Sequence, residues 1–231
     1  MYGKNAVAKS RAIADGFAVH SLFYTIQGEG PYAGYPAVFV RLGGCNLRCF
    51  WCDTEFEQGI RVLPRDALLA EIVAMAGRHA CRLIVVTGGE PLLQPVDALI
   101  QAAPPDWRFQ IETAGSVWPD GLEAVLDRVD IVCSPKTPSV HPKIAGHAFA
   151  FKYIIRAGET AADDGLPERS AQIEGAAARV FRAGPGRQVF VQPCDEPDPV
   201  RAAANMREAA RIAMRFGYRL SVQLHKIADI P

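Results

Sequence analysis

From residue 65 onward, short apolar runs alternate with stretches in which apolar residues recur at helical spacing. Residues 65–80 place six apolar residues on a helical stripe, and an apolar run follows at 83–87; the six are Leu68, Leu69, Ile72, Val73, Met75 and Ala76. The same alternation predicts helices over 96–103, 121–127 and 199–216, and strands over 108–112, 129–133, 149–155, 188–192 and 220–224. This pattern is typical of parallel βα units.

Two further strands are predicted at 18–25 and 37–42, separated by a loop at 27–34 that holds three glycines and a proline. Counting from Val38, six or seven strands fit one curved, mostly parallel sheet, which is too few for a closed barrel of eight. We therefore expect an α/β fold, an open or partial TIM-like barrel with about six parallel strands. The loops at 158–165 and 184–186 are too short for domain linkers, which favours a single domain.

The charge balance excludes some classes of partner. Lysine and arginine number 25, as do aspartate and glutamate, so the formal net charge is zero. Such a chain has no overall field to attract nucleic acid or an anionic membrane. No apolar run approaches the ~18 residues of a membrane span, and the first 15 residues lack the apolar region of a signal peptide. We expect a soluble, cytoplasmic protein that binds neither nucleic acid nor membrane.

Three of the six cysteines lie close together, at Cys45, Cys49 and Cys52, directly after a predicted strand and a Gly-Gly pair. Three thiolates can hold a [4Fe–4S] cluster and leave one iron open to a ligand. The alternative is a structural zinc ion whose fourth ligand is a histidine or one of the remaining cysteines, 81, 133 and 194. Because zinc sites usually consist of two separated pairs, the triplet favours the cluster. The other three cysteines are then small apolar residues of the scaffold.

Two motifs carry a family resemblance. Trp51 precedes the last cysteine of the triplet, and Thr87-Gly88-Gly89-Glu90-Pro91 ends a predicted strand about one βα unit later. In this respect the chain resembles the radical S-adenosylmethionine (SAM) enzymes, whose partial barrel it is then expected to share. The resemblance implies that SAM chelates the open iron, that one-electron reduction releases a 5′-deoxyadenosyl radical, and that the Gly-Gly-Glu segment contacts the methionine amino group.

From Phe23 to Pro231 the chain is similar to one family in particular, 7-carboxy-7-deazaguanine synthase (QueE). The segments that carry this similarity are 23–30, 36–41, Cys52-Asp53-Thr54, Ile111-Glu112-Thr113, Ser134-Pro135-Lys136, Gln192-Pro193 and Gln223-Leu224-His225-Lys226 with the terminal Pro231. The resemblance implies a lyase of queuosine and 7-deazapurine biosynthesis, a tRNA modification pathway. The reaction contracts 6-carboxy-5,6,7,8-tetrahydropterin to 7-carboxy-7-deazaguanine with loss of ammonia, and SAM is recycled. It further implies Mg²⁺, a flavodoxin- or ferredoxin-like reductant, and a homodimer.

The resemblance also implies which residues form the site. Arg41 and Thr54 are the expected catalytic residues, with Thr54 carrying Mg²⁺ beside the cluster ligands Cys45, Cys49 and Cys52. The expected substrate contacts are Ile26, Gln27, Gly28, Glu29, Arg41, Thr87, His225 and Pro231. The expected SAM contacts are Trp51, Cys52, Asp53, Gly89, Ser134, Pro135, Lys136, Gln192, Pro193, Cys194 and Asp195.

Physical reasons support several of these positions. Backbone amides of residues 26–28 match the donors and acceptors along a pterin edge, and Arg41 can clamp a carboxylate with two hydrogen bonds. Mg²⁺ prefers hard oxygen ligands such as the Thr54 hydroxyl and substrate oxygens. The carboxylate of Pro231 can accept from the guanidine-like side of the pterin.

Structural interpretations stay open beside these functional ones. Arg41 can be a paired strand residue, Thr54 a turn or helix-capping residue, and His225 an ordinary packed histidine. Ala114 stands where many members of the resembled family have asparagine, so no side-chain contact is expected there. Residues 1–17 precede the resemblance and are expected to form an N-terminal extension before a domain at 18–231. The segment 158–184 matches poorly and receives no site.

Two other functions compete with the synthase. One is a different small radical SAM enzyme, such as an activase that places a glycyl radical on a partner protein. The other is a binding module whose fold is held together by a zinc ion or an iron–sulfur cluster, for instance a redox sensor.

Overall fold

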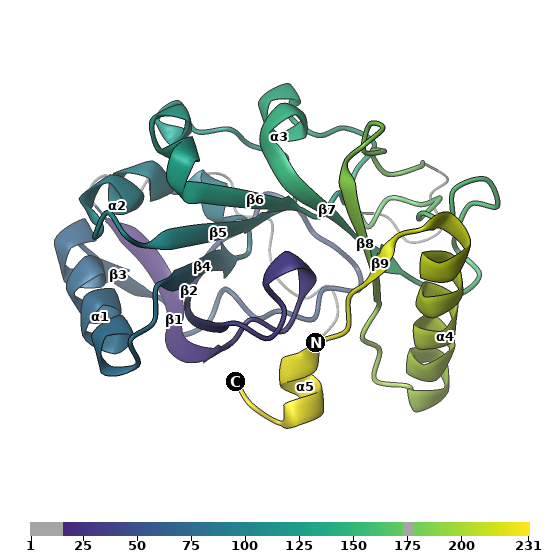
Figure 1. The fold of residues 1–231 in the computed structure, drawn as a ribbon, viewed down its shortest axis with the longest axis horizontal. Coiled ribbons are helices and arrows are strands. Elements are labelled where there is room, and N and C mark those ends of the chain that lie inside the picture. Colours follow the sequence, from purple (N-terminus) through teal and green to yellow (C-terminus); the bar gives the residue numbers. More distant parts are fainter. Residues whose placement is uncertain (1–15, 173–177) are drawn as a thin grey trace.

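The computed structural model describes residues 16–172 and 178–231, and within them nine strands form one sheet in the order β3-β1-β2-β4-β5-β6-β7-β8-β9 (Figure 1). The strands are β1 (Phe17–Ile26), β2 (Pro36–Leu42), β3 (Arg61–Leu63), β4 (Leu83–Gly88), β5 (Arg108–Thr113), β6 (Val129–Cys133), β7 (Ala148–Ile155), β8 (Gln188–Pro193) and β9 (Arg219–Leu220). From β2 to β9 all neighbouring strands run parallel, whereas β1 is antiparallel to both β2 and β3. Because β3 and β9 are the edges, the barrel is open, which confirms the expected fold class.

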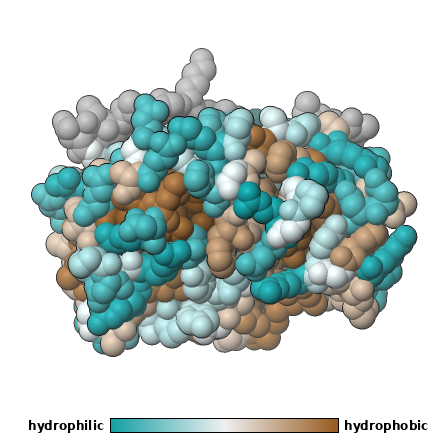
Figure 2. Space-filling model, turned by 45° about the horizontal axis from the view of Figure 1, so that its top comes forward, coloured by the Kyte–Doolittle hydropathy of each residue, from teal (hydrophilic) through white to brown (hydrophobic). Residues whose placement is uncertain are grey.

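The helices connect successive parallel strands, as the alternating pattern predicts. They are α1 (Arg65–Arg78), α2 (Val96–Ala102), α3 (Pro142–His147), α4 (Pro199–Phe216) and α5 (Leu224–Ala228), with 3₁₀ turns η1 (Gly30–Tyr32), η2 (Pro91–Leu93) and η3 (Leu122–Arg128). In Figure 1, α1 to α4 follow the outer side of the curved sheet and α5 lies below its opposite side. Within the part of the chain that the structure describes, no helix is both long and apolar enough to cross a bilayer. On the face drawn in Figure 2, hydrophilic and hydrophobic residues are interspersed.

The alternation of side chains along each strand separates an apolar outer layer from a polar inner one. On β2, Val38, Val40 and Leu42 are fully buried in the main core beneath the helices. Arg41 points to the other side, where it lines a cavity with the inner residues of neighbouring strands. The register pairs Arg41 with Thr87 of β4, so two of the expected site residues are neighbours across the sheet.

The structure corrects two local predictions and leaves a third untested. The strand expected at 220–224 comprises only Arg219 and Leu220, because the chain leaves the sheet after Ser221 donates its N–H to the Val191 carbonyl. Leu224 then donates to the Gly28 carbonyl and begins α5. The stretch expected as a helix at 121–127 is the 3₁₀ turn η3. Of the expected extension at 1–17, residues 1–15 lie outside the described residues, and Phe17 begins β1.

Candidate active site

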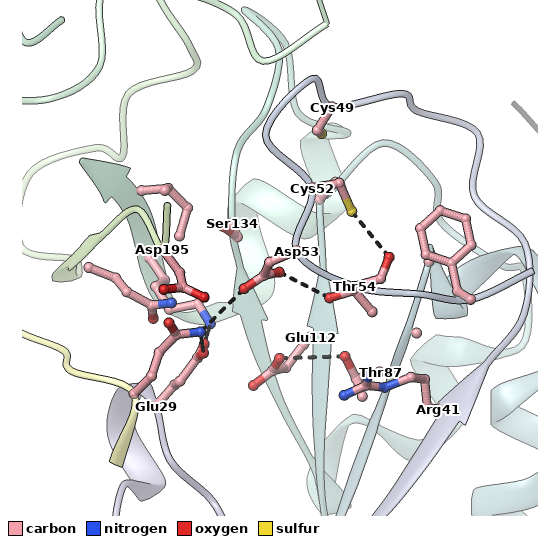
Figure 3. Close-up of a pocket in the computed structure, with 18 of the residues that line it drawn as sticks. Glu29, Arg41, Cys49, Cys52, Asp53, Thr54, Thr87, Glu112, Ser134 and Asp195 are labelled. Carbon is pink, nitrogen blue, oxygen red and sulfur yellow. Dashed lines mark hydrogen bonds and ion pairs between the residues drawn. The ribbon is translucent and has the colours of Figure 1, made fainter. Parts of the chain in front are cut away.

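A cavity of about 380 Å³ lies on the inner side of the sheet, between the cysteine loop and the C-terminal segment (Figure 3). It brings together residues that are far apart in the chain. The expected site residues that line it are Ile26, Gln27, Glu29, Arg41, Cys45, Cys49, Trp51, Cys52, Asp53, Thr54, Thr87, Gly89, Ser134, Lys136, Gln192, Pro193, Cys194, Asp195, His225 and Pro231.

Two expected site residues lie outside this lining. Pro135 lies on a small second hollow beside Phe50 and Trp51. Gly28 packs against His225, and a Cβ built on Gly28 would lie only 2.1 Å from His225 Nδ1. Gly28 therefore does not line the cavity itself. Because it has no side chain, it leaves space for the His225 ring, which does.

The Gly-Gly-Glu segment holds the start of the cysteine loop by backbone contacts. Gly89 donates its N–H to the Leu42 carbonyl at 3.1 Å, and Glu90 donates to the Gly44 carbonyl at 2.9 Å. A Cβ on Gly89 would lie 2.1 Å from the Gly44 oxygen and 2.7 Å from Cys45 Cβ. The glycine is therefore required for β4 and the cysteine loop to approach so closely.

The Glu90 side chain has a structural role, because it accepts hydrogen bonds from neighbouring segments of the chain. Its carboxylate is completely buried and accepts from Thr113 Oγ1 at 2.7 Å, Ala114 N at 2.9 Å and Leu92 N at 3.2 Å. Burial raises the pKa of Glu90. Ala114, which has no polar side chain, thus contributes its backbone N–H to this carboxylate.

The three neighbouring cysteines lie in one loop, where Cys45 is buried and Cys49 and Cys52 are partly buried. Burial raises the pKa of Cys45 to about 12 and also raises the pKa of Cys49 and of Cys52. Bound metal replaces the thiol proton, so burial of this kind is compatible with metal ligation. The donor set fits a [4Fe–4S] cluster, in which each thiolate binds a different iron.

The same geometry does not fit a structural zinc ion. Zinc needs four donors converging on one point, and among residues 16–172 and 178–231 no three histidine, cysteine, aspartate or glutamate side chains converge in this way. Cys81 lies at the opposite end of β4, where its thiol donates to the Pro36 and Leu83 carbonyls. It cannot complete a site at the cysteine loop.

Arg41 lines the cavity and carries a buried donor that no other described group uses. Its guanidinium lies 5.6 Å from the centre of the Phe23 ring. Its Nε is buried and has no hydrogen-bond partner among the described residues. A buried N–H without a partner costs free energy, and an anion in the cavity would remove that cost.

Sequence reasoning assigned no site role to four charged residues of the cavity lining, Arg48, Glu112, Lys152 and Lys226. Glu112 accepts from Gln27 Nε2 at 2.9 Å and from Thr87 Oγ1 at 3.5 Å (Figure 3). Lys152 is buried and forms an ion pair with Glu29. For Glu112 and Lys152, the sequence signal was a charged residue at an inward-facing position of a largely apolar strand. A charge that is buried there needs a partner.

The Glu29–Lys152 pair dominates the electrostatics of this end of the cavity. Burial by itself would raise the pKa of Glu29, but the Lys152 ammonium lowers it below its ordinary value. Burial would likewise lower the pKa of Lys152, but the carboxylates of Glu112 and Glu29 raise it. Both members of the pair are therefore charged near neutral pH.

The C-terminal segment closes one side of the cavity. Gln223 Nε2 donates to Glu29 at 2.8 Å, and Lys226 Nζ bridges Asp53 at 3.1 Å and Asp195 at 2.5 Å. Thr25 Oγ1 donates to a Pro231 oxygen at 2.7 Å. Burial lowers the pKa of His225, which favours the neutral ring.

The opposite wall follows β6. Lys136 Nζ donates to the Ser134 carbonyl at 2.9 Å and also contacts the Ser134 hydroxyl. It lies 5.3 Å from the centre of the Trp51 ring, and burial lowers its pKa. The Ser-Pro-Lys segment and the cysteine loop thus share one wall.

Comparison with known proteins identifies the family. The model of the radical SAM superfamily matches residues 39–173, more than half of the chain. A 7-carboxy-7-deazaguanine synthase from Rhodospirillum rubrum is 47% identical over 243 residues, covering 100% of both chains. This chain belongs to the 7-carboxy-7-deazaguanine synthase family. A second 7-carboxy-7-deazaguanine synthase, from Rickettsia prowazekii, is 35% identical and covers 100% of this chain and 96% of its own.

A solved structure of the same family confirms the fold. The crystal structure of QueE from Escherichia coli superposes with a TM-score of 0.62 at 23% identity, covering 90% of this chain and 94% of that one. Membership of the radical SAM superfamily implies a [4Fe–4S] cluster and SAM, which the cysteine loop described above can accommodate.

Proposed function

We propose that this chain is a 7-carboxy-7-deazaguanine synthase, which converts 6-carboxy-5,6,7,8-tetrahydropterin to 7-carboxy-7-deazaguanine with loss of ammonia. The observation that carries the proposal is that the cysteine triplet and the unpartnered Nε of Arg41 share one cavity. A radical enzyme acting on a small carboxylate needs both features within reach of one substrate. The name of the full-length relatives supports this choice of substrate.

In this proposal, Cys45, Cys49 and Cys52 hold the cluster, and the remaining wall binds SAM. Together, the cluster and SAM supply hydrogen abstraction by one-electron chemistry. The chain's own residues bind and orient SAM through the backbone at Gly89 and the polar groups of Ser134 and Lys136. Further contacts come from Trp51, Asp53, Pro135, Gln192, Pro193, Cys194 and Asp195. Most of these residues stand at the carboxyl ends of parallel strands, where α/β folds place their ligands.

Arg41 binds the substrate carboxylate, because its Nε offers a charged donor that no described residue uses. Thr87, its register partner, lies beside it. Gln27 and Glu112 are joined by a hydrogen bond and present a linked donor and acceptor to the ring. Ile26, Glu29, His225 and Pro231 complete the substrate side, and Gly28 acts by making room for His225.

Mg²⁺ is proposed to bind at the Thr54 hydroxyl. Thr54 Oγ1 lies 3.1 Å from Asp53 Oδ1, so hard oxygen donors are present at this point of the cavity. Mg²⁺ usually keeps several waters and binds substrate oxygens, so a site with few protein ligands suits it.

The wider setting follows from the family. We infer a flavodoxin- or ferredoxin-like protein as the electron donor, a homodimer as the working form, and a cytoplasmic location in queuosine or 7-deazapurine biosynthesis. Sedimentation of the purified protein measures the oligomeric state directly.

The test is an anaerobic reaction of reconstituted protein with reductant, Mg²⁺, SAM and 6-carboxytetrahydropterin, followed by mass spectrometry. We expect a product lighter by one ammonia, formed in molar excess over the SAM consumed. If 5′-deoxyadenosine forms without that product, radical chemistry stands and the pterin substrate is wrong. If neither forms although iron and sulfide are bound, the binding-module interpretation replaces the enzyme.

A further inference from the structure

The segment 158–184, which matched the family poorly, contributes a side chain that reaches the cysteine loop. Gln172 Nε2 donates a hydrogen bond to Cys49 Sγ at 3.4 Å. The two residues are 123 positions apart. The other two sulfurs of the triplet contact backbone groups: Cys45 Sγ accepts from Leu47 N at 3.4 Å, and Cys52 Sγ donates to the Thr54 carbonyl at 3.6 Å.

The orientation of the Gln172 amide is determined by its second contact. The backbone N–H of Arg48 donates to Gln172 Oε1 at 2.8 Å. Because a backbone N–H can only donate, the oxygen of the amide must face Arg48, and the NH₂ group must face Cys49. The amide is therefore oriented as a donor to the sulfur.

The backbone on either side holds this arrangement in place. Phe50 donates its N–H to the Ala171 carbonyl at 3.0 Å, and Ala171 donates to the Lys136 carbonyl at 3.0 Å. Ser170 Oγ also donates to the Lys136 carbonyl, at 3.0 Å. Cys49 lines the cavity and Gln172 does not, so the substrate and SAM contacts proposed above are made by other residues.

We propose that Gln172 is a positioning residue that raises the reduction potential of the cluster through its hydrogen bond to Cys49. The inference rests on the proposed radical SAM function, because it requires the cluster. Reduction adds one electron to a cluster that already carries thiolate charge, and a donor aimed at a ligand sulfur stabilises the more negative state more strongly. Gln172 therefore makes the cluster easier for a one-electron donor to reduce.

The variant that isolates this effect is Gln172→Glu. A carboxylate still accepts from the Arg48 N–H, so the link between the two loops is kept, but it cannot donate to Cys49 and adds a negative charge beside the sulfur. Gln172→Leu removes both contacts without adding charge. Ser170→Ala is the matched control, because it removes two hydrogen bonds of the same segment, to the Lys136 carbonyl and from the Gln172 backbone N–H at 3.3 Å, and keeps the Gln172 amide that reaches Cys49.

The measurement is a potentiometric titration of the full-length reconstituted protein without SAM or pterin, followed by electron paramagnetic resonance of the reduced cluster. We expect the equilibrium constant for reduction to fall about tenfold in Gln172→Glu, which is about 59 mV for a one-electron couple. In Gln172→Leu we expect a smaller fall, of about threefold, because one hydrogen bond of ordinary strength is lost and no charge is added. Ser170→Ala keeps the wild-type potential.

The possible failures are distinguishable. If Gln172→Glu binds iron and sulfide at the wild-type ratio and has the wild-type potential, Gln172 does not tune the cluster. A shift in Ser170→Ala as large as in Gln172→Glu would show an effect of loop placement and overturn the proposal. Should Gln172→Glu bind no cluster, an unchanged potential in Gln172→Leu overturns it instead. Wild-type protein without bound iron and sulfide would contradict the proposed function itself.

Discussion

Arg41 combines a buried donor with a position in the lining of the cavity. Its Nε has no partner among the described residues, and its planar group lies over the Phe23 ring. Lysine keeps the charge but loses the planar, two-pronged geometry and the stacking. The chemistry at this position therefore depends on the shape of the guanidinium as well as its charge.

We predict that Arg41→Lys lowers kcat/KM for the pterin by about 10- to 100-fold, the effect of losing a charged hydrogen bond worth roughly 1.5–3 kcal/mol. SAM affinity remains at the wild-type value, because Arg41 is assigned to the substrate side. Steady-state kinetics and SAM binding by calorimetry check both statements. Arg65→Lys, at an exposed arginine paired with Asp66 at 2.8 Å, serves as control and should change neither quantity. If Arg41→Lys lowered SAM affinity as much as it lowered kcat/KM for the pterin, Arg41 would belong to the SAM-binding residues instead.

Among the elements, the contact between the end of β4 and the cysteine loop places the strictest requirement on the backbone. Gly89 meets Gly44 and Cys45 at distances that leave no room for a side chain. Gly88 adds a backbone angle φ of +143°, which residues with a Cβ rarely adopt. The Gly88-Gly89 pair thus allows the close backbone packing that sets the position of the cysteines.

We predict that Gly89→Ala folds but binds much less iron and sulfide after reconstitution, because the added Cβ pushes the cysteine loop away from β4. Iron and sulfide analysis together with far-UV circular dichroism checks this. The matched control is Gly77→Ala in α1, where a Cβ meets nothing within 4 Å. Alanine is the better helix former by roughly 0.5–1 kcal/mol, so this control should be slightly stabilised and load normally. Full cluster loading in Gly89→Ala would contradict the packing argument.

At the scale of the whole molecule, the Glu29–Lys152 pair joins segments 123 residues apart across the inside of the open barrel. Gln223 extends the link to the C-terminal segment. The side chains of Lys152 and Glu29 are only 7% and 13% exposed, so removing one partner leaves a buried charge poorly compensated. The pair therefore holds the β1–β2 loop, β7 and the C-terminal segment in one arrangement.

We predict that Glu29→Gln lowers the free energy of unfolding by roughly 3–5 kcal/mol at neutral pH. The folded-state pKa of Glu29 lies below its ordinary value of 4.5, even though burial alone would raise it. Its contribution is therefore complete above pH 4.5 and is lost as the pH falls through the folded-state pKa. Urea unfolding of wild type and variant between neutral and acidic pH measures this difference.

The control for this prediction is Glu123→Gln, which breaks an exposed ion pair with Lys143 whose side chains are 53% and 49% accessible. Exposed pairs contribute about 0–1 kcal/mol, so the control should unfold almost as wild type does. A difference between wild type and Glu29→Gln that stays constant down to the acid limit would show that the Glu29 charge does not stabilise the fold.

The sequence by itself predicted most of the alternating strands and helices, but not β3, α3 or α5, and it set three cysteines within eight positions of one another. Apolar spacing is a local property, so α4 begins and ends where it was predicted, at Pro199 and Phe216. The spacing of the three cysteines likewise needs no knowledge of distant segments. The local pattern did not predict where an element ends when a distant contact decides it. After Ser221 donates a hydrogen bond to the Val191 carbonyl, for example, the chain leaves the sheet.

Only the tertiary structure decided which distant residues meet. Strand register places Thr87 beside Arg41, and the curvature of the sheet brings Lys152 to Glu29. Gln172 reaches Cys49 from a segment to which the sequence assigned no site. Contacts of this kind depend on how strands pair and how loops fold back over the barrel. They arise from the packing of the whole chain, which no local pattern of residues encodes.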